Sequence, residues 1–399
     1  MKQYDSIIIG AGISGLSLAH YCAKAGLQTI VLEKNKKPGG CFCSHKFEGE
    51  ASGFWLELCA HTCYNSYGNL IGLLEDCGIM GEIIRREKVG FKMLVNNEIK
   101  SIPSRINFLE LLFSVPRMLG MKREGESVES YYSKIVGKGN YEKVFGPAFD
   151  AVICQKANDF PAETLFKKRP RRKDVLKSFT FKNGLQTITD SLASRPGITL
   201  MTGVDAQAIA FRDGIFDVTA SDGNHYECDT LALAVPPHVA VNLLRPSFSE
   251  VAGLLSEIGV ESVETVGMAI KKSALPLPPL GGIIAAGDSF YSAVSRDTVP
   301  HESYRGFSFH FKAGRLDQDA KIQRICEILK VQPGQLEQIT GRQSGLPALK
   351  VNHHLLVSRI DRALDGKKLF LTGNYLLGLA IEDCVSRSLS EFSRLQKMR

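Results

Sequence analysis

Several features that would place this sequence in a specialised class are missing. It has no run of eighteen apolar residues, so a membrane-spanning helix is not expected. Only a few residues precede the first predicted strand at Tyr4, which leaves no room for a cleavable signal peptide, and we expect a cytoplasmic protein. Internal repeats and low-complexity tracts are also absent. The composition, 44% apolar and 23% charged over 399 residues, is that of an ordinary globular protein long enough for two domains.

Standard metal-ligand spacings are missing too, although the chain has ten cysteines. Four of them, Cys41, Cys43, Cys59 and Cys63, lie within a short stretch, but their spacing fits no usual zinc or iron–sulfur pattern. A disulfide framework is not expected in a long chain without a secretion signal. We therefore expect no metal and interpret these cysteines as small apolar residues, with a metal or disulfide role as the minor alternative.

The most informative feature that is present is a glycine-rich turn near the amino terminus. A short apolar run over residues 4–9, predicted to be a strand, ends in Gly10-x-Gly12-x-x-Gly15, and a helical stretch follows. Gly10 allows the tight turn, Gly12 lets the backbone approach a pyrophosphate, and Gly15 lets the helix pack closely on the strand. The helix then offers free N–H groups and a positive dipole end to phosphates. The spacing predicts a dinucleotide-binding site.

An acidic residue supports this interpretation. A second predicted strand over residues 29–32 stops at Glu33, eighteen positions after Gly15. A carboxylate at this place accepts hydrogen bonds from ribose hydroxyls. The double glycine Gly39 and Gly40 follows six residues later.

The other end of the chain favours FAD over NAD. A predicted strand over residues 368–371 leads into Gly373 and Asn374, and a new helix begins near Ala380. Free N–H groups at the start of that helix would stabilise the negative charge of a reduced flavin. The chain has only one glycine fingerprint, so we expect electrons to enter from the substrate and leave to oxygen, a quinone or another diffusible acceptor.

The order of predicted elements indicates an α/β fold with a Rossmann-type FAD-binding domain of the glutathione-reductase-like kind and an inserted α+β substrate domain. We expect the FAD-binding domain to comprise residues 1–75, 177–243 and 345–399. The substrate domain would comprise residues 76–176 and 244–344, with a helical part at about 104–165.

Two stretches suggest surfaces with a function. The run from Lys167 to Lys173 holds six cations in seven residues, within a net charge of +7. We interpret it as a solvated loop, with attraction of an anionic substrate or an anionic membrane surface as the alternatives. Residues 107–115 form a strongly apolar predicted helix, which we expect to belong to the core rather than to a membrane surface. No nucleic-acid-reading element accompanies the cations.

The catalytic residues are unknown at this level because a flavin carries the chemistry of hydride transfer itself. His61 is a weak candidate for a base near the flavin, although a satisfied core histidine is the more common case.

Several stretches together resemble the flavin amine oxidase superfamily, which includes monoamine oxidases, phytoene desaturases and protoporphyrinogen oxidases. The protoporphyrinogen oxidase and phytoene desaturase-like branch is the nearest. The resemblance rests on the fingerprint with Glu33, Gly39, Gly40 and Ser44, on residues 231–238 and 181–188, and on the final stretch from residue 369 to Cys384. Cys41 and Cys43 fill positions where the family usually has an arginine, and Cys59 stands where it often has a glycine near the flavin.

This resemblance implies a non-covalent FAD, with the adenine held by the backbone of Val204. The residues it places at the cofactor are Gly10, Gly12, Ile13, Ser14, Gly15, Glu33, Lys34, Gly39, Gly40, Ser44, Val204, Gly373, Asn374, Ala380 and Ile381.

The resemblance also implies an FAD-dependent oxidoreductase that transfers a hydride from its substrate to flavin N5. A porphyrinogen, oxidised by oxygen or a quinone in a six-electron reaction, is the first expectation for the substrate. An amine or a polyene of the phytoene type is the alternative among enzymes. A flavin-binding regulatory or structural protein without turnover is the alternative outside enzymes. The substrate would be a small apolar or anionic molecule, and peripheral contact with a membrane is an open expectation.

Overall fold

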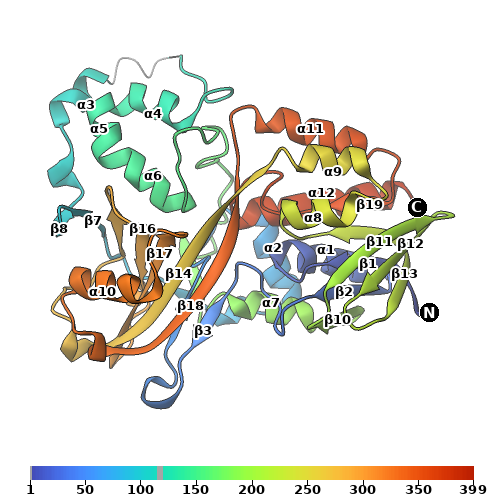
Figure 1. The fold of residues 1–399 in the computed structure, drawn as a ribbon, viewed down its shortest axis with the longest axis horizontal. Helices are drawn as coiled ribbons and strands as arrows, with labels where there is room; N and C mark the ends of the chain where they lie inside the picture. Colours follow the sequence, from blue (N-terminus) through green and yellow to red (C-terminus); the bar gives the residue numbers. More distant parts are fainter. Residues whose placement is uncertain (1, 115–119) are drawn as a thin grey trace.

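The computed structural model describes residues 2–114 and 120–399. Two large β-sheets lie side by side, each with its own helices, and a separate group of helices stands above the second sheet (Figure 1). Both chain termini lie at the end of the first sheet that is farthest from the second (Figure 1). The α/β class expected from the sequence is confirmed.

The first sheet is the one that carries the glycine fingerprint. Its strand order is β10-β2-β1-β13-β12-β11, and β19 pairs with the other half of β13. The pairs that involve β1, β2, β10, β13 and β19 among themselves are parallel, while β11 and β12 are antiparallel. The strands are β1 (Lys2–Ile9), β2 (Thr29–Glu33), β10 (Ile198–Thr202), β11 (Ala206–Arg212), β12 (Ile215–Ala220), β13 (His225–Leu233) and β19 (Leu369–Leu371).

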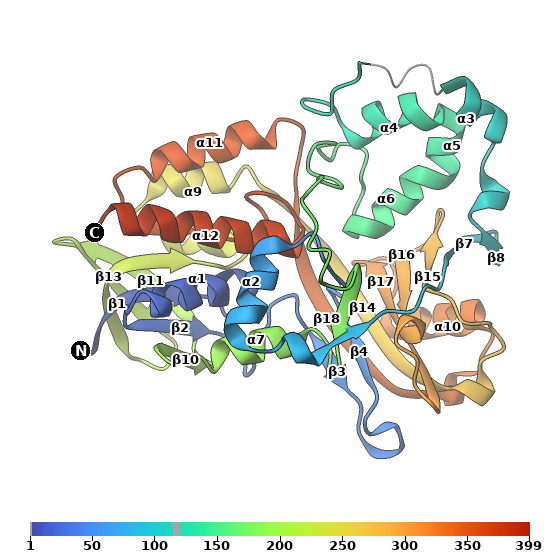
Figure 2. The ribbon, with the colours of Figure 1, turned by 180° about the vertical axis from the view of Figure 1, so that it is seen from behind.

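Helices cover both faces of this sheet because its central strands are apolar on both sides. Along β1, Ile7 and Ile9 point into one buried cluster, and Ile8 points into the other, as the two-residue period of a strand requires. The helices on the Ile8 side are α1 (Ile13–Lys24), α2 (Gly68–Cys77), α7 (Gln186–Ala193) and α12 (Ile381–Lys397), and α2 and α12 lie toward the viewer in Figure 2. The helices on the other side are α8 (Pro237–Leu244), α9 (Ser249–Leu255) and α11 (His353–Ala363).

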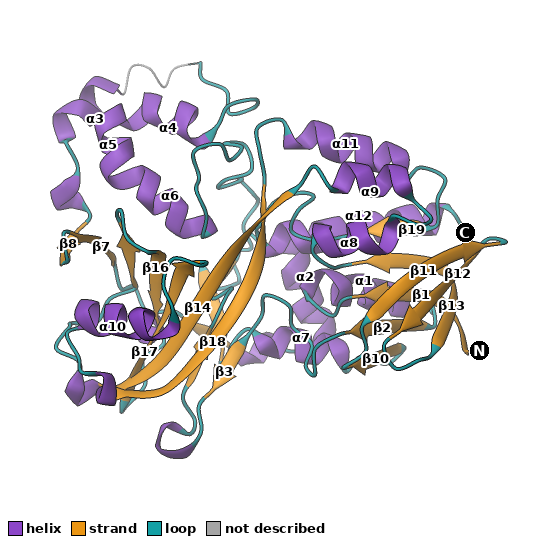
Figure 3. Cartoon of the chain, viewed as in Figure 1, coloured by secondary structure: helices purple, strands orange, loops and turns teal. Residues whose placement is uncertain are grey.

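The second sheet is mostly antiparallel and contains the two longest strands, which cross the front of the molecule in Figure 3. Its order is β18-β14-β17-β16-β15-β7-β8, with one parallel pair between β15 and β7. The strands are β7 (Phe91–Val95), β8 (Glu98–Ser101), β14 (Gly259–Lys271), β15 (Gly282–Ala285), β16 (Phe290–Ser295), β17 (Tyr304–Lys312) and β18 (Leu336–Ala348). Helix α10 (Gln318–Leu329) packs on a cluster of buried phenylalanines from this sheet.

Shorter elements join the two sheets. The small strands are β3 (Ser44–Lys46), β4 (Trp55–Glu57), β5 (Cys63–Tyr64), β6 (Ile83–Arg85) and β9 (Ser178–Phe181). The separate group of helices consists of α3 (Phe108–Ser114), α4 (Val128–Val136), α5 (Lys138–Asn140), the π-helical turn Tyr141–Phe145 and α6 (Gly146–Ile153). Short 3₁₀ turns occur at Gly49–Ala51, Met80–Glu82, Pro103–Arg105, Lys272–Ala274, Arg296–Thr298 and Pro333–Gln335.

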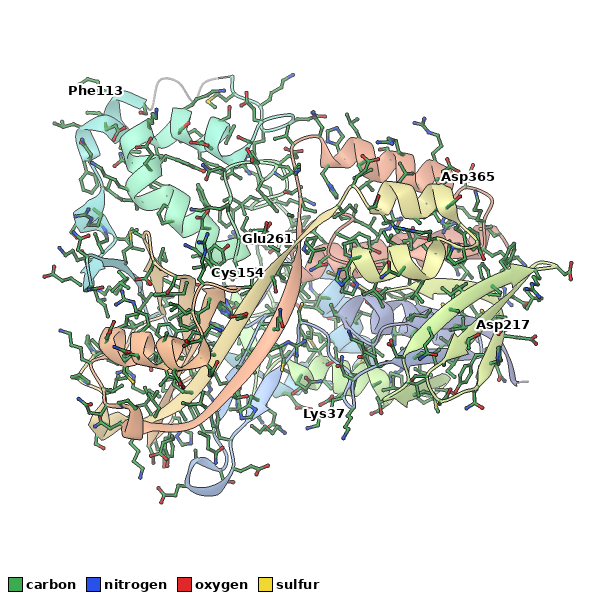
Figure 4. All side chains as sticks on the ribbon, viewed as in Figure 1. Lys37, Phe113, Cys154, Asp217, Glu261 and Asp365 are labelled. Atoms are coloured by element: carbon green, nitrogen blue, oxygen red, sulfur yellow. The ribbon has the colours of Figure 1, made fainter. Side chains whose placement is uncertain are left out.

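The apolar helix expected in the core is a surface helix, so that interpretation was wrong. Phe108, Leu109, Leu112 and Phe113 of α3 are between 62% and 75% exposed. Phe113 lies at the outer edge of the group of helices in Figure 4. The apolar content of a single short helix does not show which neighbours cover it, and Val115 lies outside the described residues. In the described part of the chain, no helix is both long and apolar enough to cross a membrane.

Candidate active site

The fingerprint turn requires glycine at two positions. Gly10 has a φ of +103°, and a Cβ atom there would lie 2.6 Å from the carbonyl oxygen of Ala234. A Cβ atom on Gly15 would lie 1.9 Å from the carbonyl oxygen of Gly10. The turn therefore fits between β1, β13 and the first turn of α1 only without side chains.

The double glycine packs directly against this turn. The backbone N–H of Gly39 donates to the carbonyl of Ala11 at 2.8 Å, and Gly39 forms a single parallel bridge with Gly12. A Cβ atom on Gly40 would lie 3.0 Å from Cα of Gly12. The two glycine segments, separate in sequence, form one surface at the start of α1, which has no acidic residue in its first turn. Such a helix start binds a pyrophosphate well.

Glu33 and Val204 lie together at the carboxyl edge of the sheet. The buried carboxylate of Glu33 accepts hydrogen bonds from the backbone N–H groups of Ala11, at 2.8 Å, and Asn35, at 2.9 Å. The N–H of Val204 donates to the carbonyl of Glu33 at 3.0 Å. Lys34 follows Glu33 with its side chain exposed. These contacts hold the acid beside the fingerprint turn, where it was predicted to be.

The last helix of the chain, α12, packs against the start of α1, next to the fingerprint turn. The Ser388 hydroxyl of α12 donates to the carbonyl of Ser14 at 2.7 Å and lies 2.8 Å from the Thr372 hydroxyl. Ser388 therefore joins α12 to the first turn of α1. Around this junction lie the predicted cofactor residues Ile13, Ser14, Gly373, Asn374, Ala380 and Ile381.

Ser44 is occupied by other contacts. Its hydroxyl donates to Glu57 at 2.9 Å and accepts from the backbone N–H of Gln186 at 3.1 Å. The other carboxyl oxygen of Glu57 accepts from the N–H of Leu185 at 2.6 Å. Burial raises the pKa of Glu57 to about 7, although these hydrogen bonds oppose the shift. In this structure Ser44 connects the β3–β4 hairpin to the start of α7.

His61 is a half-buried histidine. Burial, helped by the charge of Arg86, lowers the pKa of His61 to about 3. Its Nδ1 lies 2.7 Å from the Thr62 hydroxyl, and Arg86 donates to its carbonyl oxygen. His310 on β17 is also neutral, because burial lowers its pKa to about 4. A histidine with so low a pKa is a poor proton acceptor at neutral pH. His61 is therefore a poor candidate for a catalytic base.

Sequence inspection missed two residues of β18 that reach this region. Arg342 donates to the carbonyl of Gly40 at 2.6 Å, and the Ser344 hydroxyl lies 3.3 Å from the Cys59 thiol. The two contacts join residues that are 302 and 285 positions apart in the chain. No local pattern marks such residues, because their role comes only from the pairing of β18 in the second sheet.

The cationic run is only partly solvated. Lys167 and Arg169 form ion pairs with Asp383 at 3.1 and 2.7 Å, in the first turn of α12. Arg172 pairs with Glu75 at 2.7 Å. The side chains of Lys168, Arg171 and Lys173 are exposed. The prediction of a solvated loop is thus wrong for Lys167 and Arg169, which attach this segment to α12, whereas the pair of Arg172 and Glu75 lies at the surface.

Together, the parallel sheet, the glycine turn, the buried acid and the second helix start define a dinucleotide-binding oxidoreductase fold. The family model for flavin containing amine oxidoreductase matches residues 13–331, and the chain belongs to this family. It is therefore an FAD-dependent oxidase. The glycine cradle, which a Cβ atom would fill, and the start of α1 fit the pyrophosphate of that cofactor.

Three distant relatives cover nearly the whole chain. Protoporphyrinogen oxidase 1 from the chloroplast of Arabidopsis thaliana is 20% identical over 96% of this chain and 86% of its own length. A solved structure from Exiguobacterium sp. 255-15, described as a candidate protoporphyrinogen oxidase, has a TM-score of 0.82 at 16% identity. That alignment covers 100% of this chain and 99% of the other. Putrescine oxidase has a TM-score of 0.71 at 13% identity, covering 99% of each chain.

Proposed function

We propose that this protein oxidises a porphyrinogen by transferring hydride to flavin N5, with oxygen or a quinone as the final acceptor. The observation that carries the proposal is similarity over nearly the whole chain to a protoporphyrinogen oxidase, together with the high TM-score to a candidate of the same kind. The exposed cations Lys168, Arg171 and Lys173 suit a substrate that bears carboxylates.

We further propose how the chain's residues hold the cofactor, which supplies the hydride acceptor when it is bound. The N–H groups of residues 10–15 would face the pyrophosphate, and Glu33 the ribose. The backbone of Val204 would hold the adenine. The uncapped start of α12 at Ala380 would favour negative charge on the reduced ring.

The proposed division into domains follows the strands of the two sheets, while α9, which packs on the first sheet, would fall within the bounds of the substrate domain. Residues 1–75, 177–243 and 345–399 would form the FAD-binding domain, and residues 76–176 and 244–344 the substrate domain. The strand β18, Leu336–Ala348, would then run from one domain into the other.

The test is an anaerobic titration of the yellow holoprotein with protoporphyrinogen, with amines including putrescine, and with polyenes such as phytoene. Bleaching of the flavin absorbance by the porphyrinogen alone is the expected result. Bleaching by an amine or a polyene instead would assign the protein to that alternative. A flavin that no substrate bleaches would favour a regulatory or structural role.

The cofactor site has a test of its own. Gly12→Asp places a negative charge where the pyrophosphate is expected, and a Cβ at Gly12 lies 3.6 Å from its nearest neighbour, so the variant has room to fold. We expect purified Gly12→Asp protein to be colourless. Gly81→Asp is the control, because a Cβ there meets nothing within 4 Å. Retention of FAD by Gly12→Asp would contradict the proposed site.

We also propose that α3 touches a lipid surface. Four large apolar side chains exposed on a seven-residue helix, followed by the exposed Lys122, have the composition of an interfacial segment. Sedimentation with vesicles that contain anionic lipid should recover the native protein. The Leu109→Ser, Phe113→Ser double variant should be lost from the pellet, while Phe211→Ser on β11 should not. Concentration-dependent dimerisation through α3 without vesicle binding would contradict the proposal.

A further inference from the structure

Arg342 of β18 reaches the glycine cradle from the second sheet. Its Nη2 donates to the carbonyl oxygen of Gly40 at 2.6 Å. Gly40 in turn lies against the fingerprint turn, since a Cβ atom placed on it would be 3.0 Å from Cα of Gly12 and 3.8 Å from the backbone nitrogen of Gly12. The guanidinium is therefore linked through Gly40 to the turn at which a pyrophosphate is expected.

Arg342 has no carboxylate partner in the part of the chain that the structure describes. Its second contact is with the Ser344 hydroxyl, 3.4 Å from Nε. Of the five N–H donors of a guanidinium, these contacts use two. Arg305 and Arg324 differ, because each forms an ion pair with a carboxylate at 2.5 Å. The half-buried charge of Arg342 is thus left uncompensated by the chain.

An arginine in this state is suited to an anionic ligand. A partly buried charge without a partner is unfavourable, and the planar fork of a guanidinium matches the oxygens of a phosphate. The start of α1 lies at the same turn and has no acidic residue in its first turn, so the helix dipole also favours an anion there. Glu33, the acid of this turn, accepts its hydrogen bonds from the backbone of Ala11 and Asn35 and not from Arg342.

We propose that Arg342 binds the pyrophosphate of FAD, so that a strand of the second sheet completes the cofactor site of the first. The free N–H donors of the guanidinium bond to a phosphate oxygen, while Nη2 keeps its bond to Gly40. The inference rests on the cofactor of the proposed function and not on its substrate. It makes FAD a ligand that both sheets hold.

The experiment measures how tightly FAD is held. Holoprotein is diluted stepwise, and the released FAD is followed by its fluorescence, which gives the dissociation constant. We expect Arg342→Met to raise this constant about 10- to 100-fold, because a charge-assisted hydrogen bond to a phosphate is lost. Arg342→Lys keeps the charge without the planar fork, so a rise of about 3- to 10-fold is expected. A constant in Arg342→Met within about twofold of the native value would overturn the proposal.

The next residue on the same strand gives the matched control. Gln343 points to the other face of β18, where its side-chain amide donates to the Ser262 hydroxyl of β14 at 3.0 Å. Gln343→Met also removes a polar side chain from β18, and it should leave the dissociation constant of FAD unchanged. An equal rise in Gln343→Met and Arg342→Met would assign the effect to the strand and contradict a contact between Arg342 and the cofactor.

Two further measurements separate the charge of Arg342 from its part in the fold. The melting temperature of the FAD-free chain should differ by less than about 3 °C between the native protein and Arg342→Met, because no ion pair within the chain is lost. Sodium chloride should weaken FAD binding more steeply in the native protein than in Arg342→Met, since salt screens an ionic contact. A lower melting temperature of the FAD-free variant with an unchanged salt dependence would overturn the proposal, because Arg342 would then act only through the shape of the Gly40 segment.

The failure of this inference can be told apart from the failure of the proposed function. A native chain that binds no FAD would overturn both the cofactor site and the role of Arg342. Tight FAD binding by Arg342→Met would overturn the role of Arg342 alone. The titration with candidate substrates affects neither result, because no substrate enters these measurements.

Discussion

The fingerprint turn and the buried ion pair of Arg305 and Asp297, at one end of the second sheet, are specified in opposite ways. At the turn, Gly10 and Gly15 are required because neighbouring backbone leaves no space for a side chain. In the second sheet, the buried Arg305 of β17 forms hydrogen bonds with the buried Asp297, with Nε 2.8 Å from Oδ1. The N–H of Leu280 also donates to this carboxylate at 3.0 Å.

The two regions differ in how far apart in the chain the residues that define them lie. The requirement at Gly15 is local, since the Gly10 carbonyl that excludes a side chain lies in the same strand–turn–helix unit, whereas at Gly10 the excluding carbonyl is that of Ala234, just after β13. A buried ion pair depends on partners that only the tertiary fold brings together, and each partner alone would be an uncompensated charge. Substitutions can test whether a steric clash at the turn and an unpaired buried charge in the second sheet each lower the free energy of unfolding.

The largest effect is expected from Gly15→Val. Because the added Cβ would lie 1.9 Å from the Gly10 carbonyl oxygen, the strand and helix must separate. We expect a loss of more than about 4 kcal/mol in the free energy of unfolding, and no bound flavin. Urea denaturation measures this. Gly72→Val in α2 is the control, where a Cβ meets nothing within 4 Å and a change within about 1 kcal/mol is expected. Equal losses in the two variants would mean that the close packing at Gly15 is unimportant.

Arg305→Met should have the next largest effect. It leaves the Asp297 carboxylate buried without its cation, which costs about 3–5 kcal/mol. The exposed pair of Arg359 and Glu257 gives the comparison, since Arg359→Met should change the unfolding free energy by less than about 1 kcal/mol. Similar changes in unfolding free energy for the two variants would show that the buried Arg305 pair stabilises the fold no more than an exposed pair does.

Glu57 lies between the two regions and should make stability depend on pH. Its pKa is raised to about 7 in the folded protein, so the folded state holds a proton that the unfolded chain releases. The contribution to stability is full below the ordinary pKa of about 4.5 and is lost as pH rises to about 7, by up to roughly 3 kcal/mol. Unfolding curves between pH 5 and 8 should show this slope. It should disappear in Glu57→Gln and persist in the exposed Glu302→Gln; an unchanged slope in Glu57→Gln would assign it to another group.

The smallest effect is expected on α3, which belongs to neither region. Phe113 is 75% exposed, so Phe113→Ser should change the free energy of unfolding by no more than about 0.5 kcal/mol. Phe309 on β17 is fully buried, and Phe309→Ala should cost about 3–5 kcal/mol. Chemical denaturation compares the two. A large loss from Phe113→Ser would place its ring against residues of the same chain.

The same contrast explains what could be predicted from the sequence. The fingerprint unit and the final helix each have local patterns, and both occur in the structure. The exposure of α3 and the roles of Arg342 and Ser344 could not be predicted. They depend on which elements meet in space, and neither periodicity nor spacing contains that information.

The order of the strands in the first sheet has a consequence for biosynthesis. Strand β1 is made first, but Ile7 pairs with Leu231, about 220 residues later, and β13 in turn pairs with β19 near the end of the chain. At the usual rate of translation, β1 waits roughly ten to forty seconds for β13. During that time one edge of β1, with its run Ile7, Ile8 and Ile9, is unpaired. We therefore expect the nascent chain to depend on a chaperone that covers this edge until β13 has been made.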